Sequence, residues 1–419
     1  MRSGAENPQH TCRAAEQSNG EKNFYNRGFL IDHMTQILKF YDPIVVDSSG
    51  GYFQNFHDDG SLFDTDHKQL VSSTRILINY ALCGQFFGRA DYLEIAQHGL
   101  DYIEQVHWQE DSQSYAWTMR NHQPQDMTQQ AYGYAFVLLA YAAARKAGII
   151  LNDAPLLRTF ELLERRFWQK GFGLYADEIS AAGKLSDYRG QNSNMHLCEA
   201  MLAAYEATNR KFFLTRAICV AENICQRQAA LTAGLIWEHY STDFQIDWNY
   251  NKGDPKNLYR PWGFQPGHQT EWSKLLLTLH RHAPQSWILD RARDLFDRAY
   301  ATAWDEQHGG LIYGFDDRGD WCDDDKYFWV QAESFAAAAL LHQTTGEQQY
   351  RDAYDNLWQY SWKHFVDHDH GAWFRVLRRD NRKYSNQKSV VGAKCDYHTL
   401  GACMEVLRGM CSEHLVAKN

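Results

Sequence analysis

Hydrophobic and polar positions follow a helical pattern through most of the chain. Between residues 65 and 87, for example, Tyr80 follows Leu77 by three residues and Ile76 by four, and Leu77 follows Leu70 by seven, as on one face of an amphipathic helix. Ten segments of this kind form five pairs, at 65–87 with 90–106, 127–147 with 154–167, 195–208 with 211–231, 268–281 with 286–304, and 329–345 with 348–365. Single segments at 26–40 and 395–414 bring the number of predicted helices to twelve.

A short aromatic turn separates the helical pairs and recurs about every sixty residues. Its six copies begin at residues 50, 114, 173, 234, 309 and 371, as in Gly50-Gly51-Tyr52-Phe53 and Gly371-Ala372-Trp373-Phe374. Self-similarity at a fixed period is typical of a repeat architecture. We expect strands only within these aromatic turns.

Six helical hairpins can close into a ring or stack into an open solenoid. Similar spacing of the copies and the single helices at both ends favour the ring, an all-α (α/α)6 barrel whose hairpins are joined by short β-like aromatic turns. Residues 1–24 are polar and are predicted to form a flexible leader. Residues 25–419 contain no Gly/Ser-rich or Pro-rich linker and are predicted to form one catalytic domain.

Composition excludes several classes of protein. A formal net charge of −10 argues against a nucleic-acid partner, and there is no apolar run long enough for a membrane span. The nine cysteines are odd in number and lack a CxxC pair, which favours a reducing cytoplasm over a disulfide framework. The sequence leaves open whether the chain forms a homo-oligomer.

Polar residues recur at corresponding places in the repeats, where a ring would bring them around one central cavity. They are Arg75, Tyr132, Asn192, His196, His268, Glu271, Trp329, Glu333 and His398. Asn192 and His196 are four residues apart, and His268 and Glu271 three apart, so each pair shares a helix face. A carboxylate beside an imidazole orients the ring and raises its affinity for a proton. We therefore expect Glu271 to tune His268 for acid–base chemistry.

Each of these residues also has a structural interpretation. A single histidine in a helix is more often structural than catalytic, and Trp329 could belong to the core. Their joint appearance at matching repeat positions favours function. The runs His364–His370, Asp316–Asp317 and Asp323–Asp325 are rich in potential metal ligands, but they lack the ligand spacing of known zinc or calcium sites. We interpret them as surface loops.

The segment Pro266-Gly267-His268-Gln269-Thr270-Glu271-Trp272 resembles the PGHxxEW signature of the N-acylglucosamine 2-epimerase superfamily. That superfamily includes cellobiose 2-epimerases, sulfoquinovose isomerases and bacterial mannose isomerases. Further similar segments are Thr74–Leu77, Asp187–His196, Trp237–His239, Tyr250–Lys252 and Asp396–His398. The resemblance covers nearly the whole chain beyond about residue 30.

The resemblance implies an (α/α)6 barrel, an acid–base pair formed by His268 and His398, and a sugar held by Arg75, Asn192, His196 and Glu271. Tyr132, Trp329 and Glu333 complete the expected substrate-binding residues. The chain is most similar to the aldose–ketose isomerase branch, which implies interconversion of D-mannose and D-fructose, and of D-lyxose and D-xylulose. Val71 replaces a tryptophan of several relatives one turn before the arginine, so we expect that wall of the pocket to differ.

For this chemistry we expect His398 to move a proton between C2 and C1 through a cis-enediol. His268 would assist ring opening, and Arg75 would stabilise the developing oxyanion. The roles of the two histidines could be exchanged. No metal or cofactor is expected, and the expected partner is a monosaccharide.

Alternatives remain from the sequence. One is a sugar 2-epimerase of the cellobiose or N-acylglucosamine type, and another is a sulfoquinovose isomerase. A glycoside hydrolase or polysaccharide lyase could use Glu271 and Glu333 as its carboxylates. The last alternative is a protein that binds sugars without catalysis.

Overall fold

The computed structural model describes residues 22–42 and 44–416, with side chains described through residue 410. The predicted leader therefore lies almost entirely outside the described residues. Within them are the twelve predicted α-helices. Six inner helices are α2 (Leu70–Phe87), α4 (Ala131–Lys146), α6 (Gln191–Thr208), α8 (Pro266–His282), α10 (Phe328–Thr345) and α12 (Tyr397–Val416). Six outer helices are α1 (Arg27–Tyr41), α3 (Ala90–Tyr102), α5 (Ala154–Arg166), α7 (Lys211–Glu222), α9 (Ser286–Ala303) and α11 (Gln348–His364). Two π-helical turns, Ile103–His107 and Asn223–Gln228, extend α3 and α7.

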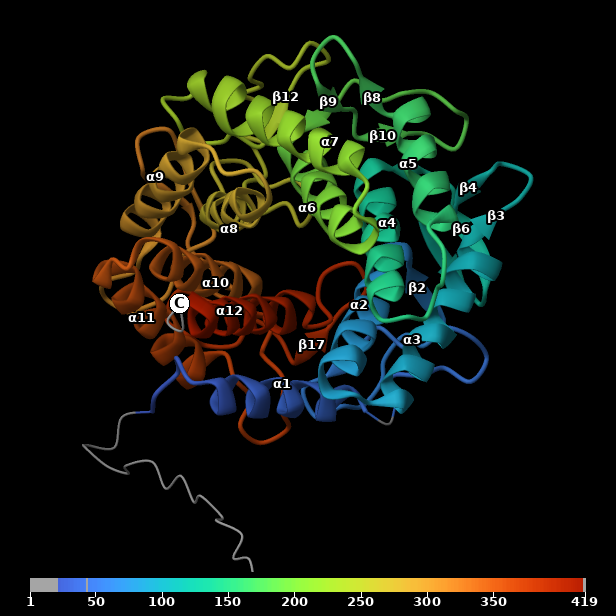
Figure 1. The fold of residues 1–419 in the computed structure, drawn as a ribbon, viewed down its shortest axis with the longest axis horizontal. Helices are drawn as coiled ribbons and strands as arrows, with labels where there is room; N and C mark the ends of the chain where they lie inside the picture. The colour runs from blue at the N-terminus through green and yellow to red at the C-terminus, as the bar shows by residue number, and fades with distance from the viewer. Residues whose placement is uncertain (1–21, 43, 417–419) are drawn as a thin grey trace, which may run out of the picture.

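The helices form a closed ring, as predicted, and not an open solenoid (Figure 1). Each inner helix contacts the next, and α12 contacts α2 to complete the circle. Each outer helix packs against an inner one, with α1 against α12, so that the first and last helices of the chain form the sixth hairpin. One continuous hydrophobic core fills the space between inner and outer helices. None of the described helices is long and apolar enough to cross a membrane.

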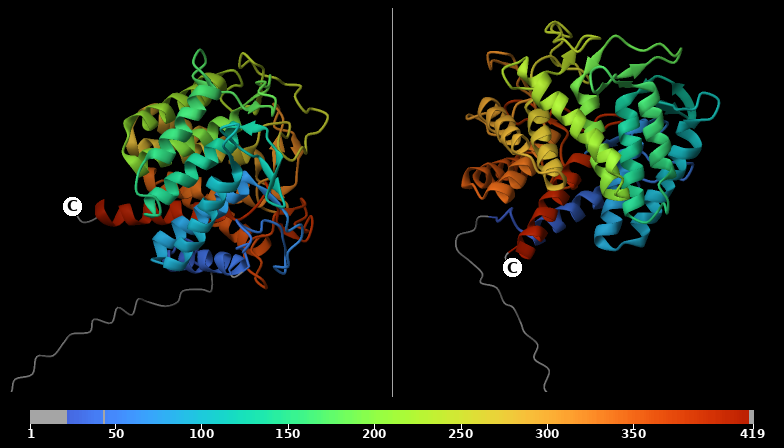
Figure 2. Two further views of the ribbon diagram at one scale, coloured as in Figure 1. Left: turned by 90° about the vertical axis from the view of Figure 1, so that its right-hand side faces the viewer. Right: turned by 45° about the horizontal axis from the view of Figure 1, so that its top comes forward.

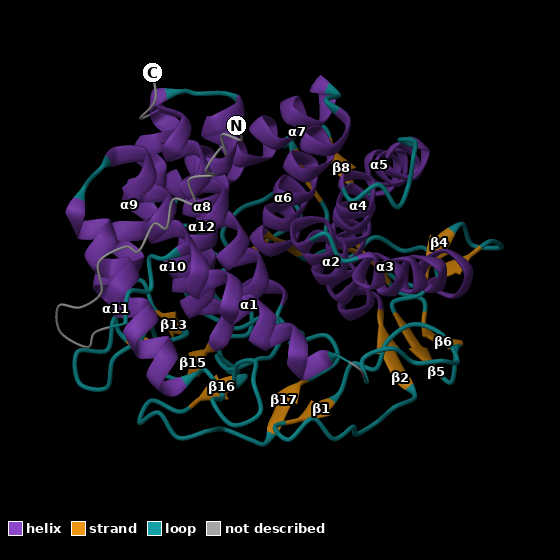
Figure 3. Ribbon diagram, turned by 60° about the horizontal axis from the view of Figure 1, so that its bottom comes forward, coloured by secondary structure: helices purple, strands orange, loops and turns teal. Residues whose placement is uncertain are grey.

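Short strands are more numerous than predicted, and they gather with the long loops at one end of the ring (Figures 2 and 3). They are β1 (Phe56–His57), β2 (His67–Gln69), β3 (Trp108–Gln109), β4 (Ser114–Tyr115), β5 (Thr118–Arg120), β6 (Gln123–Asp126), β7 (Gln129–Gln130), β8 (Trp168–Gln169), β9 (Leu174–Tyr175), β10 (Glu178–Ile179), β11 (Arg189–Gly190), β12 (His239–Tyr240), β13 (Gly314–Phe315), β14 (Trp321–Asp323), β15 (Lys326–Tyr327), β16 (Val376–Leu377) and β17 (Gln387–Ser389).

The expectation that strands occur only in the aromatic turns was wrong. β2 and β7 occupy the predicted first turns of two inner helices, which begin only at Leu70 and Ala131. The reason is pairing between repeats, since β7 pairs with β10, β11 with β12, β15 with β16, and β1 with β17. These ladders satisfy backbone groups that a helix would otherwise have paired within itself. The hydrophobic periodicity within one segment does not indicate these strand pairings between repeats.

Side-chain amides connect three inner helices to the aromatic turn that precedes each of them. Gln269 of α8 accepts from the backbone N–H of Ile236 at 2.9 Å and donates to its carbonyl at 2.8 Å. Gln331 of α10 brackets Leu311 in the same way, and Asn194 of α6 brackets Tyr175. The recurring turn is therefore a docking segment for the following inner helix, which explains its period.

Buried lysine–aspartate pairs connect the aromatic turns to the strands that follow them. The pairs are Asp47 with Lys68, Asp305 with Lys326, and Asp367 with Lys388, each separated by 21 residues. All three lysines are at most 2% exposed at the side chain. The ammonium of Lys388 donates to Asp367 Oδ2 at 2.6 Å and to the carbonyls of Gly371 at 2.8 Å and Asp58 at 3.0 Å.

Replacing Lys388 with methionine is expected to lower the free energy of unfolding by about 3–5 kcal/mol, because Asp367 is left buried without its cation. Chemical denaturation followed by circular dichroism measures the change. Arg382→Met is the control, since that arginine pairs with Asp380 at the surface and is 77% exposed; this variant should unfold like the wild type. Equal free energies of unfolding for the two variants would contradict a stabilising role of the buried Lys388–Asp367 pair.

Candidate active site

A cavity of about 630 Å³ lies inside the ring at the end that carries the strands. All six inner helices contribute residues to its lining, from their first two turns. Tyr132, Asn192, Trp329 and His398 are each the second residue of their helix. Arg75, His196 and Glu271 are each the sixth residue, and His268 is the third residue of α8. The shared register brings eight of the nine predicted site residues to one cavity.

Three histidines of the cavity are anchored through the same ring nitrogen. His398 Nδ1 is 2.7 Å from Glu333 Oε1, and His196 Nδ1 is 2.8 Å from Glu199 Oε2. His268 Nδ1 lies 3.0 Å from both carboxylate oxygens of Glu238. A carboxylate acceptor at Nδ1 places the proton there and leaves Nε2 for the cavity. Each imidazole is thereby held in one tautomer.

The partner predicted for His268 was wrong. Glu238, which immediately precedes β12, orients this imidazole and also accepts from Gln191 Nε2 at 3.0 Å. Glu271 shares the face of α8 with His268, but its side chain reaches the cavity without bonding the imidazole. Spacing within one helix could not reveal a carboxylate supplied by the preceding loop. For His196 the same spacing argument succeeds, since Glu199 is three residues further along α6.

Several buried polar atoms of the cavity residues have no hydrogen-bond partner among the described residues. They are Gln69 Oε1, Arg75 Nε, Asn192 Oδ1, both carboxyl oxygens of Glu271, and Arg375 Nε. Burial, followed by the charge of Glu333, raises the pKa of Glu271 well above its usual value. A buried polar group without a partner is costly, and hydroxyl groups of a bound sugar are the kind of partner that these atoms lack. The cavity is thus prepared for a small polyhydroxylated ligand.

Trp329 lies between the two predicted catalytic histidines. Its ring centroid is 5.0 Å from that of His268 and 5.8 Å from that of His398. His196 lies on the other side of His398, with ring centroids 6.5 Å apart. Burial lowers the pKa of His398 well below its usual value, and the nearby charges of Arg75, His196 and Lys274 act in the same direction. His398 is therefore a neutral imidazole near neutral pH.

Arg75 is fixed by aromatic side chains. Its Nη2 donates to the Tyr132 hydroxyl at 2.8 Å, and its guanidinium lies 4.4 Å from the ring centroid of Phe136 and 5.2 Å from that of Tyr397. Val71, one turn before Arg75, is 1% exposed and is not among the residues that line the cavity. The expectation that Val71 alters the cavity wall was therefore wrong.

Glu333 was expected to contact the sugar, but it lies behind His398. Its carboxylate is 1% exposed and divides its two oxygens between the His398 imidazole and the Lys274 ammonium. It borders a second, smaller cavity of about 110 Å³ below the floor of the first. Glu333 therefore orients a histidine. It is the sixth residue of its helix, as Arg75, His196 and Glu271 are of theirs, but its carboxylate bonds the His398 imidazole and Lys274 and does not reach the cavity lining.

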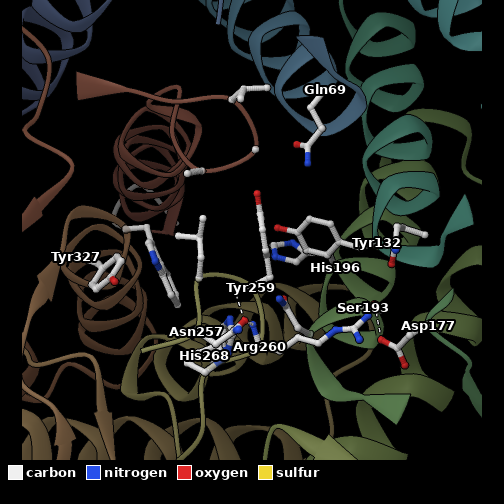
Figure 4. Close-up of a pocket in the computed structure, with 18 of the residues that line it drawn as sticks. Gln69, Tyr132, Asp177, Ser193, His196, Asn257, Tyr259, Arg260, His268 and Tyr327 are labelled. Carbon is white, nitrogen blue, oxygen red and sulfur yellow. Dashed lines mark hydrogen bonds between the residues drawn. The ribbon is translucent and has the colours of Figure 1, made fainter. Parts of the chain in front are cut away.

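The loop at 241–265, between β12 and α8, forms part of the cavity wall that sequence reasoning left without a role. Tyr259 lies across the cavity between Tyr327 and Tyr132 in Figure 4. Arg260 donates to Glu178 Oε2 at 2.9 Å on one side, and Lys256 donates to Asp325 Oδ2 at 2.8 Å on the other. The loop is thereby tied to both neighbouring repeats. The signals for it in the sequence were the similar segment Tyr250–Lys252 within the loop and its place directly before the PGHxxEW segment.

The sequence runs rich in metal-ligand residues lie outside this cavity. In the acidic run, Asp323 and Asp325 both pair with the Lys256 ammonium. In the histidine-rich run, Asp367 pairs with Lys388, and His368 Nε2 lies 2.8 Å from the carbonyl of Trp362. Both runs serve to fix loops.

Comparisons with known proteins agree with the residues and the fold. The model of the N-acylglucosamine 2-epimerase (GlcNAc 2-epimerase) family matches residues 51–402. The chain is 50% identical over 387 residues to D-mannose isomerase of Marinomonas mediterranea, covering 92% of this chain and 98% of that protein. A cellobiose 2-epimerase of Eubacterium cellulosolvens is 24% identical, over 89% of this chain and 96% of its own length.

A crystal structure of a D-mannose isomerase superposes with a TM-score of 0.91 at 49% sequence identity, covering 93% of this chain and all of that one. The family match spans more than half of the chain, and the ring of helices, the cavity and its histidines are those expected from the sequence signature. The protein belongs to the N-acylglucosamine 2-epimerase family.

Proposed function

We propose that the protein is an aldose–ketose isomerase that interconverts D-mannose and D-fructose, and also D-lyxose and D-xylulose, without a metal ion. The observation that supports this most strongly is the pair His268 and His398, which line one sugar-sized cavity with Nδ1 of each bound to a carboxylate. The 50% identity to a D-mannose isomerase over nearly the full length of both chains supports the choice of substrate.

The reaction begins when His268 assists opening of the sugar ring by moving protons among its oxygens. The neutral His398 then removes the proton from C2 through Nε2, while the electron pair forms an enediolate across C1 and C2. Arg75 stabilises the negative charge on oxygen, an electrostatic contribution worth about 3–4 kcal/mol in comparable sites. A second proton passes from O2 to O1, a transfer between oxygens that is assigned to His268, and His398 returns its proton to C1, which yields the ketose. Asn192, His196 and Glu271 hold the hydroxyl groups, and Tyr132 and Trp329 shape the cavity.

A sugar 2-epimerase would use the same residues but return a proton to the opposite face of C2. The greater similarity to D-mannose isomerase favours isomerisation over this alternative. A hydrolase or lyase would need two carboxylates facing the substrate. Glu333 lies behind His398, which leaves Glu271 without the second carboxylate proposed for that chemistry.

The function is tested by incubating the protein separately with mannose, lyxose, glucose, N-acetylglucosamine, cellobiose and sulfoquinovose, and identifying products by NMR. Fructose from mannose and xylulose from lyxose are the expected products. Glucose as the sole product from mannose, or a reaction confined to cellobiose or N-acetylglucosamine, would assign the protein as an epimerase. Conversion of sulfoquinovose alone would assign it to that isomerase class.

Chelation with EDTA is expected to leave kcat/KM for mannose unchanged. Glu271, Glu333 and His398 could together offer ligand atoms within 4.8 Å of one another. The Lys274 ammonium already binds Glu333 and lies 4.0 Å from Glu271, so a divalent cation there would meet a like charge. Loss of activity on dialysis against EDTA, restored by Zn²⁺ or Mg²⁺, would contradict the metal-free mechanism.

The acid limb of kcat/KM is expected below pH 6.5, the usual imidazole value. His398 acts as a base only when neutral, and its pKa is lowered by burial and by the positive charge of Arg75. A lowered pKa keeps the imidazole neutral to more acidic pH, so activity persists through pH 6.5. A pH profile of kcat/KM reports groups of the free enzyme. An acid limb centred above pH 6.5 would contradict the assignment of His398 as the base.

We further propose that the protein works in a reducing cytoplasm on a small-molecule sugar. The seven cysteines whose side chains lie within the described residues are free, which supports this compartment.

A further inference from the structure

A buried lysine lies directly beneath the catalytic cavity, and no step of the proposed mechanism uses it. Lys274 of α8 is only 6% exposed. Its ammonium donates to Glu333 Oε2 and lies 4.0 Å from Glu271 Oε1. A lysine is seldom buried this deeply unless it is paired, and here its pairing leads towards the reacting groups.

The three side chains form a chain of contacts that ends at the base. Glu333 accepts from Lys274 through Oε2 and from His398 Nδ1 through Oε1 at 2.7 Å. An ionised carboxylate accepts both bonds with its negative charge, whereas a protonated carboxyl loses that charge and carries an O–H donor on one of the two oxygens. Burial raises the pKa of Glu333, and the ammonium of Lys274 opposes that rise. The lysine thus favours the form of Glu333 that accepts the imidazole proton.

His268 is oriented in a different way. Glu238 accepts from His268 and from the neutral amide of Gln191 at 3.0 Å, and no ion pair between Glu238 and a lysine or arginine occurs among the described residues. The two catalytic imidazoles therefore have unlike supports, a cation for His398 and an amide for His268. This difference matches the unlike tasks of proton abstraction from carbon and proton movement among oxygens.

We propose that Lys274 is a positioning residue which, through Glu333, holds His398 in the tautomer that carries its proton on Nδ1 and a free lone pair on Nε2. Without the ammonium, Glu333 takes up a proton more readily and offers the imidazole a donor. His398 then presents a protonated Nε2 to the cavity and cannot abstract a proton. The inference rests on the proposed function only for the consequence that activity falls.

The charged and titratable groups around this chain come from five inner helices. They are Arg75 of α2, His196 and Glu199 of α6, Glu271 of α8, Glu333 of α10, and Tyr397 beside His398 on α12. Arg75 also lowers the pKa of His398, and it remains when Lys274 is removed. The glutamates raise the pKa of Lys274 above its usual value against the opposing effect of burial, so the lysine stays charged throughout the pH range of the experiment.

The test compares Lys274→Met with Lys274→Arg, which keeps the charge. ¹⁵N NMR of the histidine rings, with His398 assigned from its absence in His398→Asn, reports the tautomer without any substrate. The wild type and Lys274→Arg should show the proton on Nδ1, and Lys274→Met should lose this preference.

In the activity assay, kcat of Lys274→Met should fall about 10–100-fold, as for other residues that orient a functional histidine. Its KM should change little, and its acid limb should move to higher pH, because a cation that lowers the pKa of His398 is gone.

A second variant covers the case in which Lys274→Met does not fold. Glu333→Gln keeps the lysine but offers a single acceptor oxygen, which cannot serve both the ammonium and the imidazole. It should also lose the Nδ1 tautomer. A merely structural lysine would lower the melting temperature of Lys274→Met while leaving the tautomer and the acid limb as in the wild type, and that result would overturn the proposal. An unaltered tautomer in Glu333→Gln would overturn it too. The proposed function is tested separately, by identifying the products that the wild type forms from each sugar.

Discussion

Replacing His398 with asparagine is expected to lower kcat for mannose isomerisation by about 10²–10⁴-fold, the usual contribution of a general base. Asparagine keeps a polar side chain of similar size but cannot accept the proton from C2. The imidazole that it replaces is 6% exposed, lines the cavity and is held through Nδ1 by Glu333. Steady-state kinetics of fructose formation measures the loss, and KM should change much less.

His342→Asn is a matched control for this variant. That histidine lies in the last turn of α10, at the other end of the helix from the cavity, and its Nδ1 is 3.1 Å from the carbonyl of Glu347. Its kcat should equal that of the wild type. A protein that only binds sugars would have no turnover to lose, and an enzyme whose base lies elsewhere would retain most of its turnover in His398→Asn. Either result would remove His398 from the mechanism.

Replacing Arg75 with methionine is expected to lower kcat by about 10²–10³-fold, the usual cost of removing one oxyanion donor. The guanidinium is oriented by Tyr132 and Phe136 and has an unpartnered Nε. Negative charge on the sugar oxygens develops only in the enediolate, so the arginine should contribute more to the transition state than to the ground state. The loss should therefore appear in kcat more than in KM.

Two companion variants define what Arg75 contributes. Arg75→Lys restores the charge without the planar donor pair and should recover part of the activity. Tyr132→Phe removes one hydrogen bond to the guanidinium and should cost less than either arginine variant. If Arg75→Met raised KM and left kcat unchanged, the arginine would bind the sugar uniformly and would not stabilise the enediolate.

The ring could be predicted from the sequence because its cause is periodic. Each aromatic turn docks the next inner helix, as Gln269 and Gln331 do through Ile236 and Leu311, so the turns recur with the helices. The strands were missed because they depend on partners from other repeats. β1 pairs with β17, more than 300 residues away, and neither segment has an alternating pattern long enough to indicate a strand.

The same distinction explains the candidate site. Residues at the second and sixth positions of the inner helices were identified because the repeat aligns them. Glu238 and Lys274 were missed because their roles depend on contacts between repeats, with His268 in one case and Glu333 in the other. Glu333 was placed on the correct helix but assigned to the sugar, since sequence position does not tell which side chain lies in front of another. Whether a side chain faces the cavity or lies behind another side chain is decided by tertiary packing.

The most direct test of the account is the reaction of mannose in D₂O, followed by NMR until equilibrium, with wild type and His398→Asn in parallel. If His398 moves the proton between C2 and C1, that proton exchanges with solvent deuterium on Nε2 over repeated turnovers. The wild type should then place one deuterium at C1 of fructose, on one face, and His398→Asn should neither form fructose at the wild-type rate nor place this label over the same time. Fructose formation and C1 labelling by His398→Asn at the wild-type rate would contradict proton transfer by this histidine.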